Sequence, residues 1–569
     1  MVKKFALMYC FVFVFMFVNT NNAQVARETR AVWLTTNFRL DWPPPVYNQE
    51  TQKKELIKIL DDLKDKKFNT VYFQVRFNGT VLYKSVYEPY SYYLTGDVGG
   101  LPNYDPLEFI LKEAHARGME VHAWVNMINS FSGTENKILE NQNHIFKKHP
   151  EWLVQWFDDN KRSYWVDPGI PEARTYLTNI VTEVAANYDV DGIHFDFLRY
   201  PGRTFNDQLS YSTYGEGVDK DDWRRDNLTK LVENIYFSVK AVKPLIKVGV
   251  APIGIYKNKP GATGWEGYSE VYQDSREWLK RGIIDYVVPQ IYWDFKSNPH
   301  FDIVAKDWQD NSFNRSVILG VGAYQKTVYP EMEKMIAYAR HINSGGVAFF
   351  RYGNIKNTNF ALFNEYAYPN DMPWIKLNLP NPPKNLNFRL SGSFNSNIKL
   401  FWEKPDEKPE DVKYYSIYRL PDTDSPFNST TIYDIISCNK TSIQVPMHRP
   451  RTIKNLFAVK SLNSLFNESI NSSNVTEITI PQLKNLSEAI KGTEKIVLLN
   501  ENGNGVVILN VFENDTIELR GKRDQKTDLI LSKKVNKGKN IISVKNIDKY
   551  SSLSVIYLSA QKNYELRLN

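Results

Sequence analysis

Cysteine is almost absent from this 569-residue chain, which contains only Cys10 and Cys438. Cys10 lies in an apolar N-terminal stretch that we expect to be removed. One remaining thiol forms neither an internal disulfide nor a cysteine-based metal site. The fold must therefore rely on a hydrophobic core, for which a hydrophobic content of 42% is ample. At roughly 150 residues per domain, we expect several domains.

Long basic runs are also absent. The 71 basic and 64 acidic residues leave a net charge of +7, and no run of five or more Lys or Arg occurs. Nucleic-acid-binding proteins concentrate positive charge on one face. We therefore expect no nucleic-acid partner.

The chain has one long apolar run, Phe5–Val18, which spans fourteen residues. A membrane-spanning helix needs roughly 20, so we expect no stable membrane span. Lys3 and Lys4 precede the run and Asn19–Ala23 follows it, an order typical of a secretory signal peptide. We predict a signal peptide over residues 1–23. Export without disulfides indicates a periplasmic, cell-surface or secreted bacterial protein.

Aromatic residues are abundant, at 14% of the chain, and tryptophan is unevenly placed. Twelve of the thirteen tryptophans lie between Trp33 and Trp374, and Trp402 is the last. Some fill a core, whereas others are candidates for a cleft that stacks flat ligand faces.

Strand-like and helix-like patterns alternate from residue 31 to about 368. Eight short apolar runs alternate with helical spacing of i, i+3, i+4 and i+7, which predicts an α/β fold, a (β/α)8 TIM barrel over residues 24–378. An open doubly wound sheet is the alternative, but no glycine-rich phosphate loop follows any run. The predicted strands are Ala31–Thr36, Thr70–Arg76, Glu120–Asn126, Gly192–Phe197, Lys247–Pro252, Tyr286–Trp293, Val317–Val321 and Gly346–Arg351.

Beyond the proline-rich linker Leu379–Pro383 the pattern changes to short strands. Pro382–Leu386, Leu400–Trp402 and Tyr414–Arg419 resemble fibronectin type III domains, although Phe457 stands where a corner tyrosine is usual. We predict a fibronectin type III-like β-sandwich over residues 379–482. A small C-terminal all-β domain, β-sandwich-like in its alternation, is predicted over 483–569.

Strand parity identifies the side chains that face the barrel interior. In Gly192–Phe197 the apolar residues Ile193, Phe195 and Phe197 share one parity and should face the helices. The opposite parity should then face inward in each strand, toward the end where barrel enzymes hold their catalytic groups. On four strands this rule selects Tyr72, Gln74, Arg76, His122, Trp124, Asn126, His194, Asp196, Gln290, Tyr292 and Asp294.

Asp196 and Asp294 are the carboxylates that parity brings to these strand ends. Two carboxyl groups across a cleft are what glycoside hydrolysis requires, and their separation decides between retention and inversion. We predict Asp196 as nucleophile or base and Asp294 as acid, with either order open and Glu266 or Asp274 as alternative partners. The predicted substrate-binding residues are Arg76, His122, Trp124, Asn126, His194, Gln290, Tyr292 and Trp293.

Several segments, in the same order, resemble the bacterial glycosyl-hydrolase-like family 10. They are Arg27–Trp33, Tyr104–Leu107, Glu113–Gly118, His122–Asn126, Asp191–Asp196, Arg199–Pro201 and Asp285–Trp293. The resemblance implies a (β/α)8 glycosidase acting on bacterial polysaccharides, with cell-wall glycan among its substrates. It implies Asp196 as the principal catalytic acid.

The chain departs from related patterns at several positions. Phe197 follows Asp196 where many members of the family carry a second acid, and Met127–Asn129 replaces a proline-containing segment. The segment around Asp196 also resembles the motif of family 18 chitinases, but Leu198 stands where their catalytic Glu would be. The end of the fifth strand lacks the Glu of the α-amylase class.

Two other functions remain open at this stage. A barrel that binds glycans without cleaving them explains the tryptophans equally well, and a metal-dependent polysaccharide deacetylase is a third reading. His122, His194 and the aspartates show no recognised metal-ligand spacing. We therefore expect an exported glycosidase with a polysaccharide or oligosaccharide substrate, no cofactor and no metal.

Overall fold

The computed structural model describes residues 24–158, 161–391, 397–446, 455–478, 497–501, 504–511, 513–524, 526–559 and 562–567. The predicted signal peptide lies outside these residues. The described chain divides into two units. One holds the residues up to Asn378 with Pro426–Ser437 and Leu462–Asn467, and the other holds Leu379–Ser425, Cys438–Ser461 and the residues from Glu468 onward.

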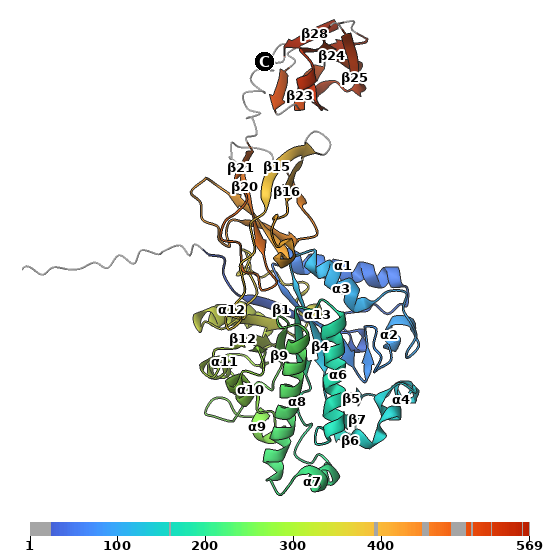
Figure 1. Cartoon of the computed structure of the whole chain (residues 1–569), viewed down its shortest axis with the longest axis vertical. Helices are drawn as coiled ribbons and strands as arrows, with labels where there is room; N and C mark the ends of the chain where they lie inside the picture. Colours follow the sequence, from blue (N-terminus) through green and yellow to red (C-terminus); the bar gives the residue numbers. More distant parts are fainter. Residues whose placement is uncertain are drawn as a thin grey trace, which may run out of the picture. The chain divides into compact units, whose positions relative to one another are not determined.

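Parallel strands form the centre of the first unit (Figure 1). Each of the eight predicted strands is present, with ends that differ by two residues at most. They are β1 (Thr29–Leu34), β2 (Thr70–Phe77), β4 (Glu120–Asn126), β8 (Gly192–Asp196), β9 (Lys247–Val250), β10 with β11 (Tyr286–Val287 and Gln290–Ile291), β12 with β13 (Ser316–Val317 and Leu319–Val321) and β14 (Gly346–Phe349).

The strand pairings run in a closed circuit. Strand β1 pairs with β2, and β4, β8, β9, β10 and β12 follow in that order. β10 and β11 are two parts of the sixth strand, and β12 and β13 are two parts of the seventh. The pairings of β11 with β13, of β13 with β14 and of β14 with β1 therefore close the circuit. The sixth strand is divided at Pro289, which lacks the N–H that a ladder requires. This circuit of parallel strands is the arrangement of the predicted (β/α)8 barrel.

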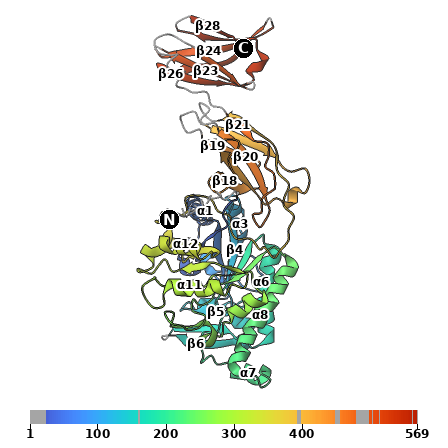
Figure 2. The same cartoon turned by 90° about the vertical axis from the view of Figure 1, so that its left-hand side faces the viewer.

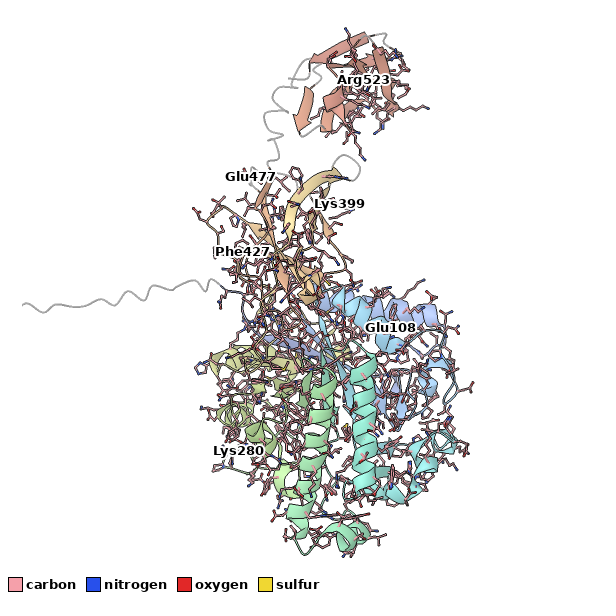
Figure 3. All side chains as sticks on the ribbon, viewed as in Figure 1. Glu108, Lys280, Lys399, Phe427, Glu477 and Arg523 are labelled. Atoms are coloured by element: carbon pink, nitrogen blue, oxygen red, sulfur yellow. The ribbon has the colours of Figure 1, made fainter. Side chains whose placement is uncertain are left out.

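Helices surround the strands because each is apolar along one face. In α3 (Pro106–His115) Leu107, Ile110 and Ala114 are buried, whereas Glu108 lies on the outer surface (Figure 3). α6 and α8 lie side by side (Figures 1 and 2). The other helices around the strands are α1 (Gln49–Asp65), α6 (Pro171–Asn187), α8 (Lys220–Val242), α10 (Ser275–Arg281), α11 (Phe301–Asp310) and α12 (Met332–His341).

Short elements occupy the connections. The antiparallel strands β5 (Asn129–Ser132), β7 (Lys161–Val166) and β6 (Leu153–Asp158) form a small sheet between β4 and β8 in the sequence. The other short elements are β3 (Thr80–Val81), α2 (Tyr92–Thr95), α4 (Lys137–Glu140), α5 (Ile145–Lys148), α7 (Gln208–Tyr214), α9 (Gly267–Glu270) and α13 (Tyr352–Ile355).

Two separate apolar clusters confirm the parity rule. Ile193 and Phe195 belong to the large cluster that packs between strands and helices. Tyr72 and Trp124 belong to a smaller cluster with Trp33, made of side chains of the opposite parity. Parity therefore places Tyr72 and Trp124 correctly on the interior side of the strands. It fails for Arg76, because β2 has a register shift after Gln74 and Arg76 pairs with Val125, a residue of the helix-side cluster.

The second unit contains only β-strands and short 3-10 turns among its described residues. β15 (Lys384–Ser391), β16 (Asn397–Glu403) and β19 (Ser442–Pro446) form one antiparallel sheet. A further sheet contains β17 (Tyr414–Leu420), β20 (Asn455–Leu462) and β21 (Thr476–Ile478), while β18 (Ile432–Ser437) groups with the first unit. Small sheets of this kind agree with the predicted all-β character of this region.

Seven further strands follow residue 496 within the described chain. β22 (Val497–Glu501), β23 (Asn504–Val511) and β26 (Gly538–Val544) form one sheet, and β24 (Asp515–Arg523), β25 (Lys526–Val535), β27 (Ser552–Tyr557) and β28 (Lys562–Arg567) form another. Leu509, Leu519, Val555 and their neighbours make a separate hydrophobic core. Within the described ranges no helix is both long enough and apolar enough to cross a membrane.

Candidate active site

Three adjacent polar side chains lie at the carboxyl ends of the strands. Asn126 is the last residue of β4 and is in register with Asp196, the last residue of β8. Gln290, the first residue of β11, places its Nε2 3.4 Å from Asp196 Oδ1. The structure therefore brings together three of the predicted site residues.

The surroundings of Asp196 favour its protonated form. Its residue surface is only 9% exposed, and burial raises the pKa of the carboxyl above its usual value. The positive charge of Arg199 lowers the pKa, as do the Phe197 backbone N–H, which donates to Oδ1 over 2.8 Å, and the Gln290 amide. Burial outweighs these effects, so Asp196 has the character of a general acid.

An aromatic group borders Asp196 on one side. The Trp124 indole forms no hydrogen bond of standard geometry with a described residue, yet it is close enough to lower the pKa of Asp196. Phe350 packs against Trp124 and Tyr292, with ring centroids 6.4 and 5.8 Å away. Burial, and next the charge of Asp196, raise the pKa of Tyr292, which keeps its phenol protonated.

Arg199 is the second neighbour of Asp196, whose pKa its charge lowers. No role was predicted for Arg199. Its guanidinium carbon lies 4.9 Å from the ring centroid of Phe197, 5.0 Å from that of Trp265 and 5.9 Å from that of Trp165. The sequence could have indicated Arg199, because it lies three residues after Asp196 and begins the family-like segment Arg199–Pro201.

The exposed aromatic rings of this region lie in loops after the strands. Phe38 is 60% exposed after β1, Trp265 is 47% exposed after β9, and Tyr324 is 50% exposed after β13. Trp124 is buried, and Trp293 packs partly buried against the helix-side cluster. The rings available for stacking on a sugar are therefore in loops, where strand parity does not apply.

Gln74 holds the loop that carries Phe38. Its Oε1 accepts hydrogen bonds from the backbone N–H groups of Thr36 and Asn37 over 3.0 and 2.8 Å. Its Nε2 lies 3.4 Å from Asn126 Oδ1. Phe38 itself has a left-handed φ of 54°, a strained conformation that persists only where the surroundings hold it.

Asp294 lies beyond the end of β11, and its carboxylate accepts hydrogen bonds within its own loop. Its Oδ1 accepts from the backbone N–H groups of Lys296 and Ser297 over 2.8 and 2.7 Å. These bonds lower the pKa of Asp294, which keeps it ionised. An ionised carboxylate suits a base or nucleophile, which is one of the two orders left open by the sequence.

The alternative partners also have local hydrogen bonds. Glu266 accepts from the Asn258 backbone N–H, and Asp274 accepts from the Tyr256 hydroxyl over 2.6 Å. Among the described residues, no direct contact joins Asp196 to Asp294, Glu266 or Asp274.

Arg76 has a structural position instead of the sugar-binding one predicted. It is fully buried and donates to both carboxylate oxygens of Glu88 over 2.7 and 2.6 Å. It also donates to the backbone carbonyls of Asn126 and Met127. Arg76 therefore holds the end of β4 and presents no surface to a substrate.

His122 and His194 lie deeper in the barrel, in a run of hydrogen bonds that we call the axial chain. It links Trp33, His194, Tyr286, His122, Glu120 and Lys247. Both histidines are buried, so we revise their predicted contact with substrate hydroxyls.

Donor chemistry determines the direction of the axial chain. Trp33 Nε1 only donates, over 2.9 Å, so His194 Nε2 accepts and its proton is on Nδ1. His194 then donates to the Tyr286 oxygen over 3.2 Å, and Tyr286 donates to His122 Nδ1 over 2.6 Å. His194 is thereby a neutral imidazole, and burial holds its pKa well below its usual value.

Comparison with known proteins identifies the family of this chain. The model of the family described as "Glycosyl hydrolase-like 10" matches residues 28–339, more than half of the chain. "Glycosyl hydrolase YngK" of Bacillus subtilis (strain 168) is 35% identical over 70% of this chain and 84% of its own length. "Glycosyl hydrolase DigH" of Escherichia coli (strain K12) is 38% identical over 50% of this chain and 71% of its own length.

Among solved structures, the PgaB (BpsB) glycoside hydrolase domain from Bordetella bronchiseptica is similar to this chain, and the match covers 59% of this chain and 98% of that domain. The TM-score is 0.45 at 15% sequence identity, too distant for an inference about activity. Family membership rests instead on the sequence matches, and the family model covers the barrel strands from β1 to β13. By these matches, the chain belongs to the glycosyl hydrolase-like 10 family.

Proposed function

We propose that this protein is an exported bacterial glycoside hydrolase that cleaves O-glycosidic bonds of a polysaccharide, with cell-wall glycan among the candidates. One observation carries the proposal. Asp196, whose pKa burial raises, lies at the end of β8 beside Gln290 and Asn126. A carboxyl group with a raised pKa, among hydrogen-bonding groups and aromatic rings, is suited to protonate a glycosidic oxygen.

The proposed reaction begins with Asp196 as the acid. Its proton passes to the leaving oxygen as the bond to the anomeric carbon breaks. A water oxygen completes the hydrolysis, and its proton restores an acid group on the enzyme. Gln290 and Asn126 are placed to bind sugar hydroxyls or to orient Asp196, and Tyr292 supplies a phenol donor.

Asp294 is the first candidate for the ionised partner, as nucleophile or as base for the water. Its lowered pKa supports this assignment, which is one of the two orders left open by the sequence. The bonds it accepts from its own loop oppose it, so Glu266 and Asp274 stay as alternatives.

The primary test measures release of reducing ends from polysaccharides, including peptide-free peptidoglycan strands. We expect release by the wild type and a loss of at least about 1,000-fold in Asp196→Asn, because an amide cannot deliver the proton. An unchanged melting temperature in that variant excludes unfolding. If the wild type binds glycans and releases no ends, the hydrolase assignment is wrong.

A second test identifies the partner. Asp294→Asn removes a carboxylate, whereas Ser297→Ala removes only a hydroxyl that contacts Asp294 over 3.3 Å. A catalytic Asp294 predicts loss of activity in the first variant, recovery with added azide, and near wild-type activity in the second. Equal loss in both variants, without azide recovery, indicates a structural role.

A glycan-binding protein without catalysis is the second candidate function. Two observations favour it: Phe197 occupies the position of the second acid in many family members, and the three candidate partners hold their own loops. Binding that is equal in the wild type and Asp196→Asn, with no product from either, is the result that would establish it.

Export and the accessory domain are parts of the same proposal. Residues 1–23 carry the pattern of a signal peptide, so N-terminal sequencing of the mature protein from the periplasm or medium should begin near Gln24. A new terminus elsewhere, or retention in the cytoplasm, contradicts export.

The fibronectin type III-like assignment of residues 379–482 is supported by the buried Trp402, whose ring packs on Tyr415 with 5.4 Å between the ring centroids.

A further inference from the structure

Arg199 is a cation that donates no hydrogen bond to any residue that the structure describes. Among the described residues, none accepts a hydrogen bond from its guanidinium, and none forms an ion pair with it within 4.0 Å. By contrast, Arg76 is paired with Glu88, Arg224 with Asp207, and Arg351 with Asp41. A guanidinium has five N–H donors, so this one retains its capacity for a ligand.

Aromatic rings hold this guanidinium at the site. Phe197, Trp265 and Trp165 all lie within 5.9 Å of its carbon. Stacking fixes the plane of an arginine without using its N–H groups. The side chain is only partly exposed, and burial lowers its pKa. The free enzyme thus keeps a partly desolvated, oriented cation at the strand ends.

The charge of Arg199 also acts against the proposed chemistry. It is the strongest influence lowering the pKa of Asp196, and so it favours the ionised form of the proposed acid. An anion bound to Arg199 would neutralise this effect and return Asp196 toward its protonated form. The arrangement is therefore more consistent with an occupied Arg199 than with an empty one.

We propose that Arg199 binds a carboxylate on the sugar that occupies the position beside Asp196, so that this enzyme selects glycans with acidic sugars. The inference rests on the proposed function and adds a substrate class to it. One guanidinium matches one planar carboxylate through two parallel N–H donors. The carboxylate belongs either to a hexuronic acid or to an ether-linked acid on an amino sugar.

Arg203 provides a matched control in the same loop. Its side chain is 56% exposed and pairs with Glu270 over 3.0 Å, so it already has an anionic partner. Arg199→Met and Arg203→Met each remove one positive charge and keep a long aliphatic stem. A general electrostatic attraction for acidic glycans would be weakened by both changes, whereas a specific carboxylate contact would be lost only in Arg199→Met.

The experiment compares each glycan with its carboxyl-reduced form. Polygalacturonate and peptide-free peptidoglycan strands represent the two carboxylate sources, and reduction converts each carboxyl to a neutral hydroxymethyl group. Binding is measured by calorimetry in the Asp196→Asn background, and hydrolysis is measured with Asp196 intact. The full-length mature protein is used in both measurements.

We expect the acidic form of one glycan to bind about 10- to 100-fold more tightly than its reduced form, as a charge-assisted bidentate contact would give. Arg199→Met should remove this preference, Arg199→Lys should recover it in part, and Arg203→Met should retain it. In Arg199→Met, the alkaline limit of kcat/KM should also move to higher pH, because the charge that lowers the pKa of Asp196 is gone. A merely structural role predicts neither change.

Each outcome has a separate meaning. If glycans are bound or cleaved but carboxyl reduction has the same effect in wild type and Arg199→Met, the carboxylate contact is refuted and the proposed function stands. If the preference disappears equally in Arg203→Met, the attraction is general and the specific contact is again refuted. If no glycan is bound or cleaved in any form, the proposed function fails and this inference fails with it.

Discussion

Lowering the pH from 7.5 to 5.0 is a direct test of the axial chain. His194 accepts a hydrogen bond from Trp33 at Nε2 and donates one from Nδ1 to Tyr286, so a second ring proton would have to replace the Trp33 hydrogen bond. Burial, with the neighbouring His122 as a smaller cause, holds the pKa of His194 well below its usual value. The folded protein therefore keeps this residue neutral at pH values where the unfolded chain binds a proton.

The sign and size of the effect follow from proton linkage. Above roughly pH 6.5 neither state binds a proton at His194, so the full stability is present. Below that value the unfolded state binds more protons, and stability falls by about 1.4 kcal/mol for each pH unit. Between pH 7.5 and 5.0 this amounts to about 2 kcal/mol from His194 alone.

Urea unfolding followed by tryptophan fluorescence is the suitable assay. Twelve of the thirteen tryptophans lie between Trp33 and Trp374, so the signal reports mainly on the barrel. We expect the wild type to lose about 2 kcal/mol more than His194→Phe between pH 7.5 and 5.0, while His194→Phe is less stable at pH 7.5. His341 is exposed on α12, and His341→Asn should behave as the wild type. Equal pH dependence in wild type and His194→Phe would refute the reasoning, and His194→Gln provides a second comparison if His194→Phe does not fold.

Four further variants test other parts of the structure. Arg76→Met should cost about 3–5 kcal/mol in the free energy of unfolding, because it leaves the buried Glu88 carboxylate unpaired; denaturation that matches wild type would contradict this. Gln74→Ala should cost about 1–3 kcal/mol and reduce activity through the loop after β1, and unchanged unfolding and kinetics would argue against that link. Phe38→Ala and Trp265→Ala should each raise KM about 3- to 10-fold with an unchanged melting temperature, as expected when an exposed ring stacks on a sugar; a change in kcat alone would not fit.

Strand parity was readable from the sequence because successive side chains of a strand point to opposite faces. It placed Asn126, Asp196 and Gln290 on the interior side, and the structure brings them together. Parity does not give depth, however. His194 precedes Asp196 by two residues and shares its parity, yet it lies in the axial chain, fully buried.

The periodic pattern of the strands could not predict the exposure of loop residues. Phe38, Trp265 and Tyr324 follow strands and have no period from which their exposure could be read. Asp294 has the right parity, but its side chain accepts bonds from the backbone of its own turn, a local competition that a strand pattern ignores.

The sequence by itself determined the barrel, its strand positions and the interior face of each strand, because apolar periodicity and chain length are local properties. Only the tertiary structure decided which interior groups reach the strand ends. Burial depth, the Arg76 and Glu88 ion pair and the raised pKa of Asp196 depend on neighbours from distant segments. Arg199 shows the same division, since its position is read from the sequence, whereas only the fold shows that no described residue accepts a hydrogen bond from it.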